Sequence, residues 1–411
     1  MITRSSTARR LPAVAALTAA LCAGCASGGD EEQQPAKSSA SAPHGYVEGA
    51  EESAEQQSRL VLGDPATGET RVLDLITEKT HRTPTVKGVT ALTTDGRFGH
   101  FHSGSGVTVL DTGAWMVDHG DHVHYYRADI RPVGRIPADG DADVAIRSDA
   151  AVTAVTTEDG GARLHRRADL EDGRVGKGRD AGIGRPAAVI PSDEHLVVVA
   201  GDDQDDRITV RTRAGKQVAA PKTACRDLRG DAVTRRGVVL SCADGAVLVR
   251  EEDGDFEAVE IPYPEDTPEG ERADGFRLRP GSDTLTALAG DEAVWVLDVT
   301  DRKWQRIGTG PVVAANTAGE GAPLLALGPD GTLRGYDIES GRRTAETELG
   351  AKATGTGKGS GAPDIAVDTT RAYVSDPAGK RVAEIDYNDG LRLARSFDLD
   401  IRPGLMVETG R

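Results

Sequence analysis

Residues 276–308 read FRLRPGSDTLTALAGDEAVWVLDVTDRKWQRIG, in which runs rich in β-branched residues alternate with turns that carry Asp and Gly. This alternation is typical of short antiparallel strands. The same phrase recurs from about residue 58 onward, and no amphipathic run is long enough for a helix. The strands expected to open successive units are Gly88–Leu92, Val144–Arg147, Ala187–Ile190, Ala232–Thr234, Phe276–Leu278, Val312–Ala315 and Asp364–Val367.

The spacing of these opening strands, about 35 to 55 residues, predicts an all-β chain folded as a β-propeller. Eight blades would each take about 44 residues of the stretch 58–411, and eight is preferred over the alternative of seven. The unit that begins at Arg59 lacks an inner strand, and Gly404–Glu408 is a lone strand at the other end. We therefore expect the N- and C-terminal strands to pair and close the ring, which leaves no exposed sheet edge.

Composition excludes several classes of protein. The 411 residues include 50 Gly and 20 Pro with 4% aromatic residues, which describes a loop-rich soluble chain rather than a helical bundle or a polytopic membrane protein. Lys and Arg number 49 against 66 Asp and Glu, a formal net charge of −17. A surface with this much negative charge repels the phosphate backbone of nucleic acids. We therefore expect no nucleic-acid partner.

The N-terminus has the pattern of an export signal. Three Arg precede the apolar run 11–21, which is too short to span a bilayer. The run closes on Leu21-Cys22-Ala23-Gly24-Cys25, which resembles a bacterial lipobox and implies a lipid anchor on Cys25 at the outer face of the cytoplasmic membrane. Simple cleavage and secretion is the alternative. We therefore expect a signal peptide with lipobox at 1–25, a flexible tether at 26–57 and the propeller at 58–411.

Two cysteines remain after the signal region. Cys225 and Cys242 are 17 positions apart, and in an oxidising export compartment such a pair is most simply a disulfide. Two reduced thiols in the core are the alternative.

Five of the nine His fall within one 25-residue window, in the phrases Phe98-Gly-His-Phe-His102 and Asp118-His-Gly-Asp-His-Val-His124. Alternate residues of a strand share one face, so His100 and His102 point the same way, as do His122 and His124. His119 follows Asp118 and is brought back by Gly120, and Asp121 can ligate or orient a ligand His. The expected metal ligands are His100, His102, His119, Asp121, His122 and His124.

Imidazole and carboxylate donors without thiolate suit zinc, copper or nickel, and metal availability outside the cell favours zinc. Five aromatic residues in the same window are expected to form local core packing: Phe98, Phe101, Trp115, Tyr125 and Tyr126.

The stretch Thr112-Gly-Ala-Trp-Met-Val-Asp-His-Gly-Asp-His-Val-His-Tyr-Tyr126, with Ala224–Ala232 and Leu240–Gly245, resembles the exported zinc metallochaperones of the AztD type. The resemblance runs through most of residues 58–411. It implies a β-propeller that holds zinc outside the cytoplasmic membrane and passes it to the solute-binding lipoprotein of a zinc ABC importer. Residues that match the family's motif are His119, Asp121, His122 and His124.

Two other classes of function remain open. Propellers also host enzymes, including lactonases and hydrolases, but the sequence has no strand-turn-helix nucleophile elbow and no carboxylate pair that demands a catalytic role. A propeller that only displays loops to a surface partner is the second alternative. The expectation is therefore a zinc-binding metallochaperone that is not an enzyme.

Overall fold

The computed structural model describes residues 49–118, 122–137, 144–157, 161–201, 206–319, 321–352 and 361–411. The expected signal peptide, Cys25 and most of the expected tether lie outside these residues. The described residues fold almost entirely into strands, and their helical elements are the short helix α1 (Arg167–Glu171) and the 3-10 turn η1 (Glu269–Glu271). The prediction of an all-β chain is confirmed.

Apart from a small sheet that contains β1, the described residues form eight antiparallel sheets, which follow one another along the chain and are numbered in that order. Sheet 1 contains, in spatial order, β34 (Leu405–Thr409), β2 (Arg59–Gly63), β3 (Thr70–Asp74) and β4 (Thr80–Thr83). Sheet 2 contains β5 (Val89–Thr94), β6 (Phe98–Ser103), β7 (Gly106–Asp111) and β10 (Arg131–Pro137). Sheet 3 contains β11 (Val144–Ser148), β12 (Val152–Thr157), β13 (Gly161–Arg166) and β14 (Arg179–Asp180). Sheet 4 contains β15 (Pro186–Ser192), β16 (His195–Ala200), β17 (Ile208–Thr212) and β18 (Gln217–Ala219).

The second half of the chain repeats the pattern. Sheet 5 contains β19 (Gly230–Thr234), β20 (Gly237–Cys242), β21 (Gly245–Glu252) and β22 (Asp255–Pro262). Sheet 6 contains β23 (Thr284–Ala289), β24 (Ala293–Asp298) and β25 (Lys303–Gly308). Sheet 7 contains β26 (Ala314–Thr317), β27 (Leu324–Leu327), β28 (Thr332–Tyr336) and β29 (Arg343–Glu348). Sheet 8 contains β30 (Ile365–Val367), β31 (Ala372–Asp376), β32 (Arg381–Asp386) and β33 (Arg392–Asp398).

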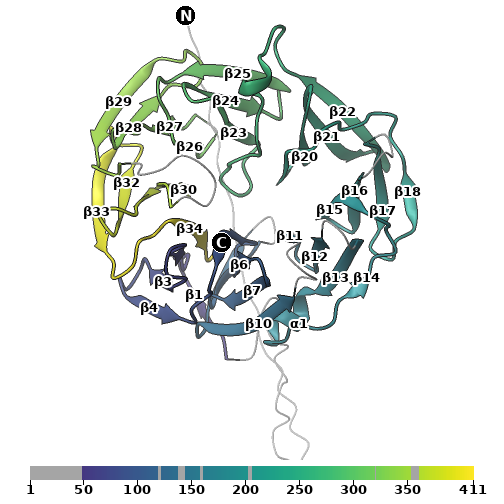
Figure 1. Cartoon of the computed structure of the whole chain (residues 1–411), viewed down its shortest axis with the longest axis horizontal. Helices are drawn as coiled ribbons and strands as arrows, with labels where there is room; N and C mark the ends of the chain where they lie inside the picture. Colours follow the sequence, from purple (N-terminus) through teal and green to yellow (C-terminus); the bar gives the residue numbers. More distant parts are fainter. Residues whose placement is uncertain are drawn as a thin grey trace, which may run out of the picture. The chain divides into compact units, whose positions relative to one another are not determined.

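Apolar packing joins each sheet to the next. Buried side chains form clusters that each span two consecutive sheets, such as Phe98 and Val109 of sheet 2 with Val155 of sheet 3. Another cluster links sheet 8 to sheet 1 through Tyr373 and Leu60. Figure 1 shows the sheets of the described region following one another around a ring. Stacking of this kind is how a propeller buries the two faces of each sheet.

The two ends of the folded region meet in sheet 1. Strand β34 pairs antiparallel with β2, from Arg59 opposite Thr409 to Gly63 opposite Leu405. The first strand of this sheet therefore comes from the C-terminal end of the chain and the other three from the N-terminal end. This pairing gives β2 a partner on each side, so neither of its edges is open.

The expected opening strand at Phe276–Leu278 is wrong. This segment makes a single bridge, between Arg277 and Thr286, and sheet 6 has three strands within a stretch that is described throughout. Pro280 has no N–H to donate to a neighbouring strand, and the N–H of Ser282 turns back to the carbonyl of Arg279. The chain therefore turns away before a second pair of residues can form.

The stretched second unit contains an inserted hairpin. Between β7 and β10, which pair with each other, the chain leaves sheet 2 and forms β8 (Ala114–Asp118) and β9 (Val123–Arg127). Gly113 closes the base of the hairpin with a positive φ of 65°, and a Cβ there would collide with the carbonyl oxygens of Ala128 and Asp129. A glycine is therefore required at this crossing.

Part of the expected tether is a strand. Glu51–Ser53 forms β1, which pairs antiparallel with β9 and gives a small sheet of order β1-β9-β8. The tether therefore cannot extend to residue 57 as a free linker. The polar composition of this segment indicated a linker, but its backbone gains ladder hydrogen bonds from the hairpin, a partner that its own sequence does not reveal.

Cys225 and Cys242 form the disulfide that the sequence indicated. Cys225 lies in the connection that enters sheet 5, and Cys242 ends β20 of the same sheet. Both side chains are buried. The bond closes a loop whose cross-link contributes about 3 kcal/mol to the free energy of unfolding.

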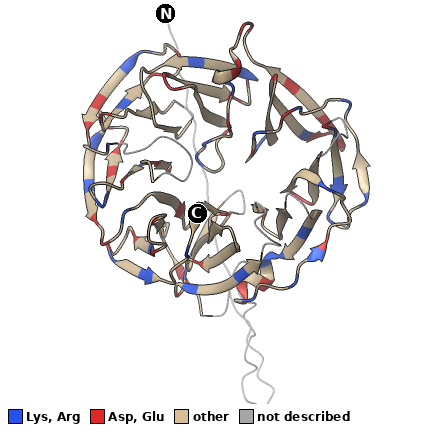
Figure 2. Cartoon of the chain, in the orientation of Figure 1, with Lys and Arg blue, Asp and Glu red and all other residues tan. Residues whose placement is uncertain are grey.

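Charged residues lie on the outermost strands of the sheets, apart from β18 of sheet 4, whose sequence is Gln-Val-Ala. Figure 2 shows Lys and Arg interspersed with Asp and Glu along these outer strands. A mixed pattern of this kind keeps sheet edges soluble and discourages pairing with other chains. Within the described residues, no helix has the length and apolarity needed to cross a membrane.

Candidate metal centre

The hairpin brings two of the expected ligands together. In the β8–β9 ladder Val117 lies opposite His124 and Asp118 lies opposite Val123, so His122 stands at the tip, just before β9 begins. The ring centroids of His122 and His124 are 4.9 Å apart, with the planes at 78°. Two nitrogens bound to one tetrahedral zinc are roughly 3.3 Å apart, given zinc–nitrogen distances of about 2.0 to 2.1 Å. The two imidazoles are close enough to share an ion.

A column of stacked groups supports this pair. His124 stacks on Tyr126 with ring centroids 6.3 Å apart, and Tyr126 stacks on Trp115 at 5.4 Å. The guanidinium of Arg97 lies 3.7 Å from the centroid of the Trp115 ring. Trp115 and Tyr126 are buried, as the sequence led us to expect of the aromatic residues in this window. The hairpin is therefore fixed to sheet 2 by its own side chains.

An ion pair fixes the base of the column. Arg97 donates to both carboxylate oxygens of Asp111, at 3.1 and 2.9 Å, and both residues are about 1% exposed. Asp111 also accepts the backbone N–H of Gly113 at 3.0 Å, at the point where the hairpin leaves β7. The orientation of the hairpin is thus tied to a buried, bidentate hydrogen-bonded pair.

Glu52 adds a carboxylate that sequence reasoning missed. Its Oε1 is 2.6 Å from Nδ1 of His124, across a separation of 72 residues. Glu52 belongs to β1, inside the segment that composition marked as a tether. No local motif could have indicated it, because the contact depends on how β1 pairs with β9.

Two expected ligands, His119 and Asp121, lie outside the described residues. They belong to the three-residue gap between Asp118 and His122, in the connection between β8 and β9. Within the described residues, no group of three or more His, Cys, Asp or Glu side chains is placed to hold a metal ion. The described part of the hairpin therefore offers two imidazoles and the carboxylate of Asp118, and Glu52 of β1 adds a carboxylate beside His124.

His102 lies away from the hairpin, at the other end of β6. Phe98 pairs with Asp111, where the hairpin begins, whereas His102 pairs with Val107, four ladder positions further along. Four positions in a strand span roughly 13 Å. Both ring nitrogens of His102 face polar atoms, Nδ1 the carbonyl of Val144 at 3.0 Å and Nε2 the hydroxyl of Thr93 at 2.9 Å. Its placement is that of a link between sheets 2 and 3.

His100 is sealed between the same two sheets. It is 1% exposed, and its Nε2 has no hydrogen-bond partner. Burial lowers the pKa of His100 to about 4, although the carboxylate of Asp95 acts in the opposite direction. The ring is therefore neutral at physiological pH and belongs to the core. The structure brings together His122 and His124, and it places His100 and His102 elsewhere.

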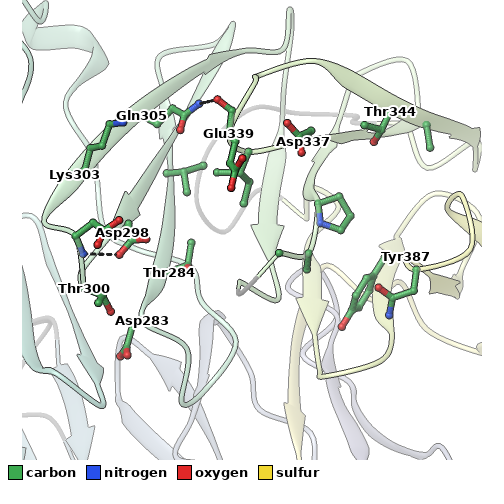
Figure 3. Close-up of a pocket in the computed structure, with 18 of the residues that line it drawn as sticks. Asp283, Thr284, Asp298, Thr300, Lys303, Gln305, Asp337, Glu339, Thr344 and Tyr387 are labelled. Atoms are coloured by element: carbon green, nitrogen blue, oxygen red, sulfur yellow. Dashed lines mark hydrogen bonds between the residues drawn. The ribbon is translucent and has the colours of Figure 1, made fainter. Parts of the chain in front are cut away.

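A pocket with a volume of about 940 Å³, lined mainly by sheets 6, 7 and 8, is an alternative candidate site. Figure 3 shows Asp283 and Asp298 on one side of it and Asp337 and Glu339 on another. The lining contains no His and no Cys. Asp283 is 3.5 Å from Arg236, and Asp337 accepts a hydrogen bond from the backbone of Ser340. The pocket therefore presents separated carboxylates and no pairing of a nucleophile with an imidazole base.

Comparisons with known proteins agree with the fold. The chain matches no protein-family model, and no curated protein sequence matches it. Its structure is similar to the crystal structure of AztD from Citrobacter koseri, with a TM-score of 0.72 and 18% identity over 86% of this chain and 98% of that one. The structure of apo AztD from the same organism gives 0.71 and 17% over the same shares.

A third similar structure has a different activity. Dihydro-heme d1 dehydrogenase NirN in complex with DHE has a TM-score of 0.55 and 16% identity, over 87% of this chain and 76% of that one. The chain therefore has the AztD-type fold. Similarity at this level of identity establishes the architecture and leaves the function to be argued from the site.

Proposed function

We propose that this protein is an exported zinc metallochaperone, which binds zinc at the β8–β9 hairpin and delivers it to the solute-binding lipoprotein of a zinc ABC importer. The observation that carries the proposal is the pair His122 and His124, 4.9 Å apart on a column of stacked side chains. The AztD-type fold and the export signal in the sequence support it.

The proposed ligands come from the hairpin alone. His122 and His124 supply two imidazoles, and His119 and Asp121, which flank Gly120 in the same connection, complete a set of the kind that zinc prefers. His100 and His102 are left out of the set because they are placed between sheets 2 and 3. Copper and nickel suit the same donors, so the metal has to be identified by measurement.

Exposure of the site suits a carrier. The side chain of His124 is 27% exposed, and His122 is exposed at the hairpin tip. An acceptor can therefore approach the ligands without any opening of the propeller, and zinc can pass by exchange of one imidazole at a time.

We also propose the number of blades and the cellular location of the protein. We take the eight sheets as eight blades, closed by the pairing of β2 with β34. A lipid on Cys25 would hold the propeller at the outer face of the cytoplasmic membrane, where the importer's lipoprotein is also held. Release by simple cleavage would leave a secreted carrier with the same site.

An enzyme is the less supported alternative. The similarity to NirN means that the fold by itself is compatible with catalysis. The pocket on sheets 6 to 8 lacks His and Cys, and the hairpin site is exposed rather than enclosed. An exposed metal site exchanges ligands readily but does not exclude water from a reaction.

The test is the zinc content of a double variant. We expect the full chain to bind about one zinc at the hairpin and the His122→Ala, His124→Ala variant to bind close to none, because two ligands of a tetrahedral set are lost. Mass spectrometry under native conditions and a competition titration with a chromogenic chelator measure this. The matched control is His81→Ala, His195→Ala, which removes two half-buried His elsewhere and should leave zinc binding unchanged.

Transfer is tested with the same proteins. Zinc should pass from the loaded chain to the importer's solute-binding protein faster than it dissociates into excess chelator. Unchanged zinc stoichiometry in the double variant would rule out the hairpin site. If transfer is no faster than passive dissociation, the protein stores zinc and does not deliver it to the acceptor.

A further inference from the structure

A second pocket lies between sheets 1 and 2, at the base of the inserted hairpin. Its volume is about 660 Å³, within the range of roughly 300 to 1,000 Å³ that is typical of sites for small ligands. Residues of β4, of the C-terminal end of the hairpin and of the segment that enters β1 line it. Neither His122 nor His124 is among the lining residues, so the pocket is separate from the proposed zinc ligands.

Three arginines from three different strands line this pocket: Arg59 of β2, Arg82 of β4 and Arg127 of β9. Arg59 is about 3% exposed, whereas the side chains of Arg127 and Arg82 are 38% and 80% exposed. Arg59 therefore lies deepest, and the other two are nearer to solvent. Guanidinium groups are the side chains best suited to bind planar oxyanions, because their N–H groups form a fixed fork.

The two inner arginines share one carboxylate oxygen. Oδ2 of Asp74 is 3.3 Å from Nε of Arg59 and also 3.3 Å from Nη2 of Arg127. The other oxygen of Asp74 accepts the backbone N–H groups of Ile76 and Thr77, at 3.1 and 2.8 Å. One negative charge thus serves two positive charges at this end of the pocket.

Arg59 has donor capacity to spare. Its Nε donates to Asp74, and its Nη1 donates to the carbonyl of Thr112, while Nη2 makes no hydrogen bond to any described residue. Burial lowers the pKa of Arg59, and the nearby Arg127 acts in the same direction, although Asp74 opposes both. An anion next to Nη2 would supply the missing acceptor and favour the charged guanidinium.

The third arginine also shares its partner. Nη2 of Arg82 donates to Oδ2 of Asp400 at 3.1 Å, but the same carboxylate accepts two hydrogen bonds from Arg71, at 2.8 and 2.9 Å. Because Arg71 is buried and bidentate to Asp400, Arg82 is the more weakly held of the two. Arg82 is therefore placed to contact a ligand that enters the pocket.

The rest of the lining limits what the ligand can be. Leu110 and Ile130 provide apolar walls, which suit a carbon skeleton and are of no use to a small inorganic ion. Glu51 and Asp129 also line the pocket, and both are exposed. Glu51 lies opposite Arg127 in the β1–β9 ladder, so its carboxylate opposes the binding of any anion there.

We propose that this pocket binds a small organic carboxylate, with the carboxylate group on the guanidiniums of Arg59 and Arg127 and the carbon skeleton against Leu110 and Ile130. Arg82 binds a second carboxylate group where the ligand carries one. This proposal does not rest on zinc binding, because the pocket is built without the imidazoles of the hairpin.

The test is calorimetric titration of the metal-free full chain with succinate, citrate and benzoate. We expect at least one of these acids to bind at one site with a dissociation constant below about 1 mM. Arg127→Gln should weaken that binding about tenfold or more, because a hydrogen bond between charged groups is lost. Arg343→Gln is the matched control: it removes an exposed arginine from β29 of sheet 7 and should change the affinity by less than about twofold.

A second variant changes the affinity in the opposite direction. Glu51→Gln removes the negative charge opposite Arg127, so it should strengthen binding of the same acid by roughly two- to fivefold. A variant that merely disturbed the fold would not bind more tightly. Arg127→Gln leaves Arg59 paired with Asp74, so the buried ion pair survives in it, and its tryptophan fluorescence should match that of the natural protein.

Three results would overturn the proposal. The first is that none of the three acids binds below about 1 mM. The second is that Arg127→Gln and Arg343→Gln bind the acid equally well, which would place any binding elsewhere. The third is that inorganic phosphate or a Glu-rich peptide binds in an Arg127-dependent way while the three acids do not, which would make the class of ligand wrong. None of these results bears on the zinc content of the hairpin.

Discussion

Replacing Arg97 by Met is expected to lower the free energy of unfolding by about 3 to 5 kcal/mol, the range for removing one partner of a buried ion pair. Arg97 is bidentate to Asp111, and both are almost completely buried. The substitution leaves Asp111 with Arg131 as its remaining cation, and the side chain of Arg131 is 41% exposed. Urea unfolding followed by tryptophan fluorescence measures the change.

The same substitution should also weaken zinc binding, because it removes the group that stacks on Trp115. The matched control is the double variant Arg97→Met, Asp111→Asn, in which no buried charge is left without its partner and the amide oxygen can still accept the N–H of Gly113. This variant should recover most of the stability but not the stacking. If Arg97→Met is as stable as the natural protein, the ion pair does not support the hairpin.

Acidification from pH 7 to pH 5 is expected to cost the protein about 2 kcal/mol through His100 alone. The pKa of His100 is about 4 in the folded state, against 6.5 for an ordinary His. Below pH 6.5 the His100 imidazole is therefore protonated in the unfolded chain but stays neutral in the folded chain until the pH approaches 4. The stabilising contribution is complete above pH 6.5, decreases as the pH falls, and is exhausted near pH 4, for a total of about 3 kcal/mol.

His100→Leu isolates this effect. We expect the loss of unfolding free energy between pH 7 and pH 5 to be smaller in this variant by about 2 kcal/mol, because Leu cannot take up a proton in the unfolded state. His195→Leu is the control, since His195 is partly exposed on sheet 4, and it should keep the pH dependence of the natural protein. An identical pH dependence in His100→Leu would mean that His100 titrates normally in its buried position.

The ring could be predicted from the sequence because each unit carries its own signal. Alternating β-branched strands and Asp/Gly turns repeat often enough to be recognised even where one unit fails. The failure at Phe276–Leu278 has a local cause, since Pro280 stops the ladder after one pair. Expected strands at Val144, Ala187 and Ala232 fall within sheets 3, 4 and 5.

Of the candidate metal site, the sequence predicted the placement of residues that are close together on one strand. The spacing of His122 and His124 on one strand places their rings together, because alternation along a strand is a local property. The structure places His100 and His102 apart from this pair, because β6 runs away from the base of the hairpin and carries His102 to its opposite end. The contact of Glu52 with His124 could not be predicted from the sequence, because it depends on the pairing of β1 with β9.

The hairpin is an insertion between two strands that pair directly with each other, β7 and β10. Sheet 2 has its four strands without it, so the ladder of that sheet does not depend on residues 114–127. The sequence of the proposed metal-binding appendage can therefore be changed while the ladder of sheet 2 stays the same. Conversely, the appendage can be grafted onto the corresponding connection of another propeller, provided that Arg97, Asp111 and Gly113 are transferred with it.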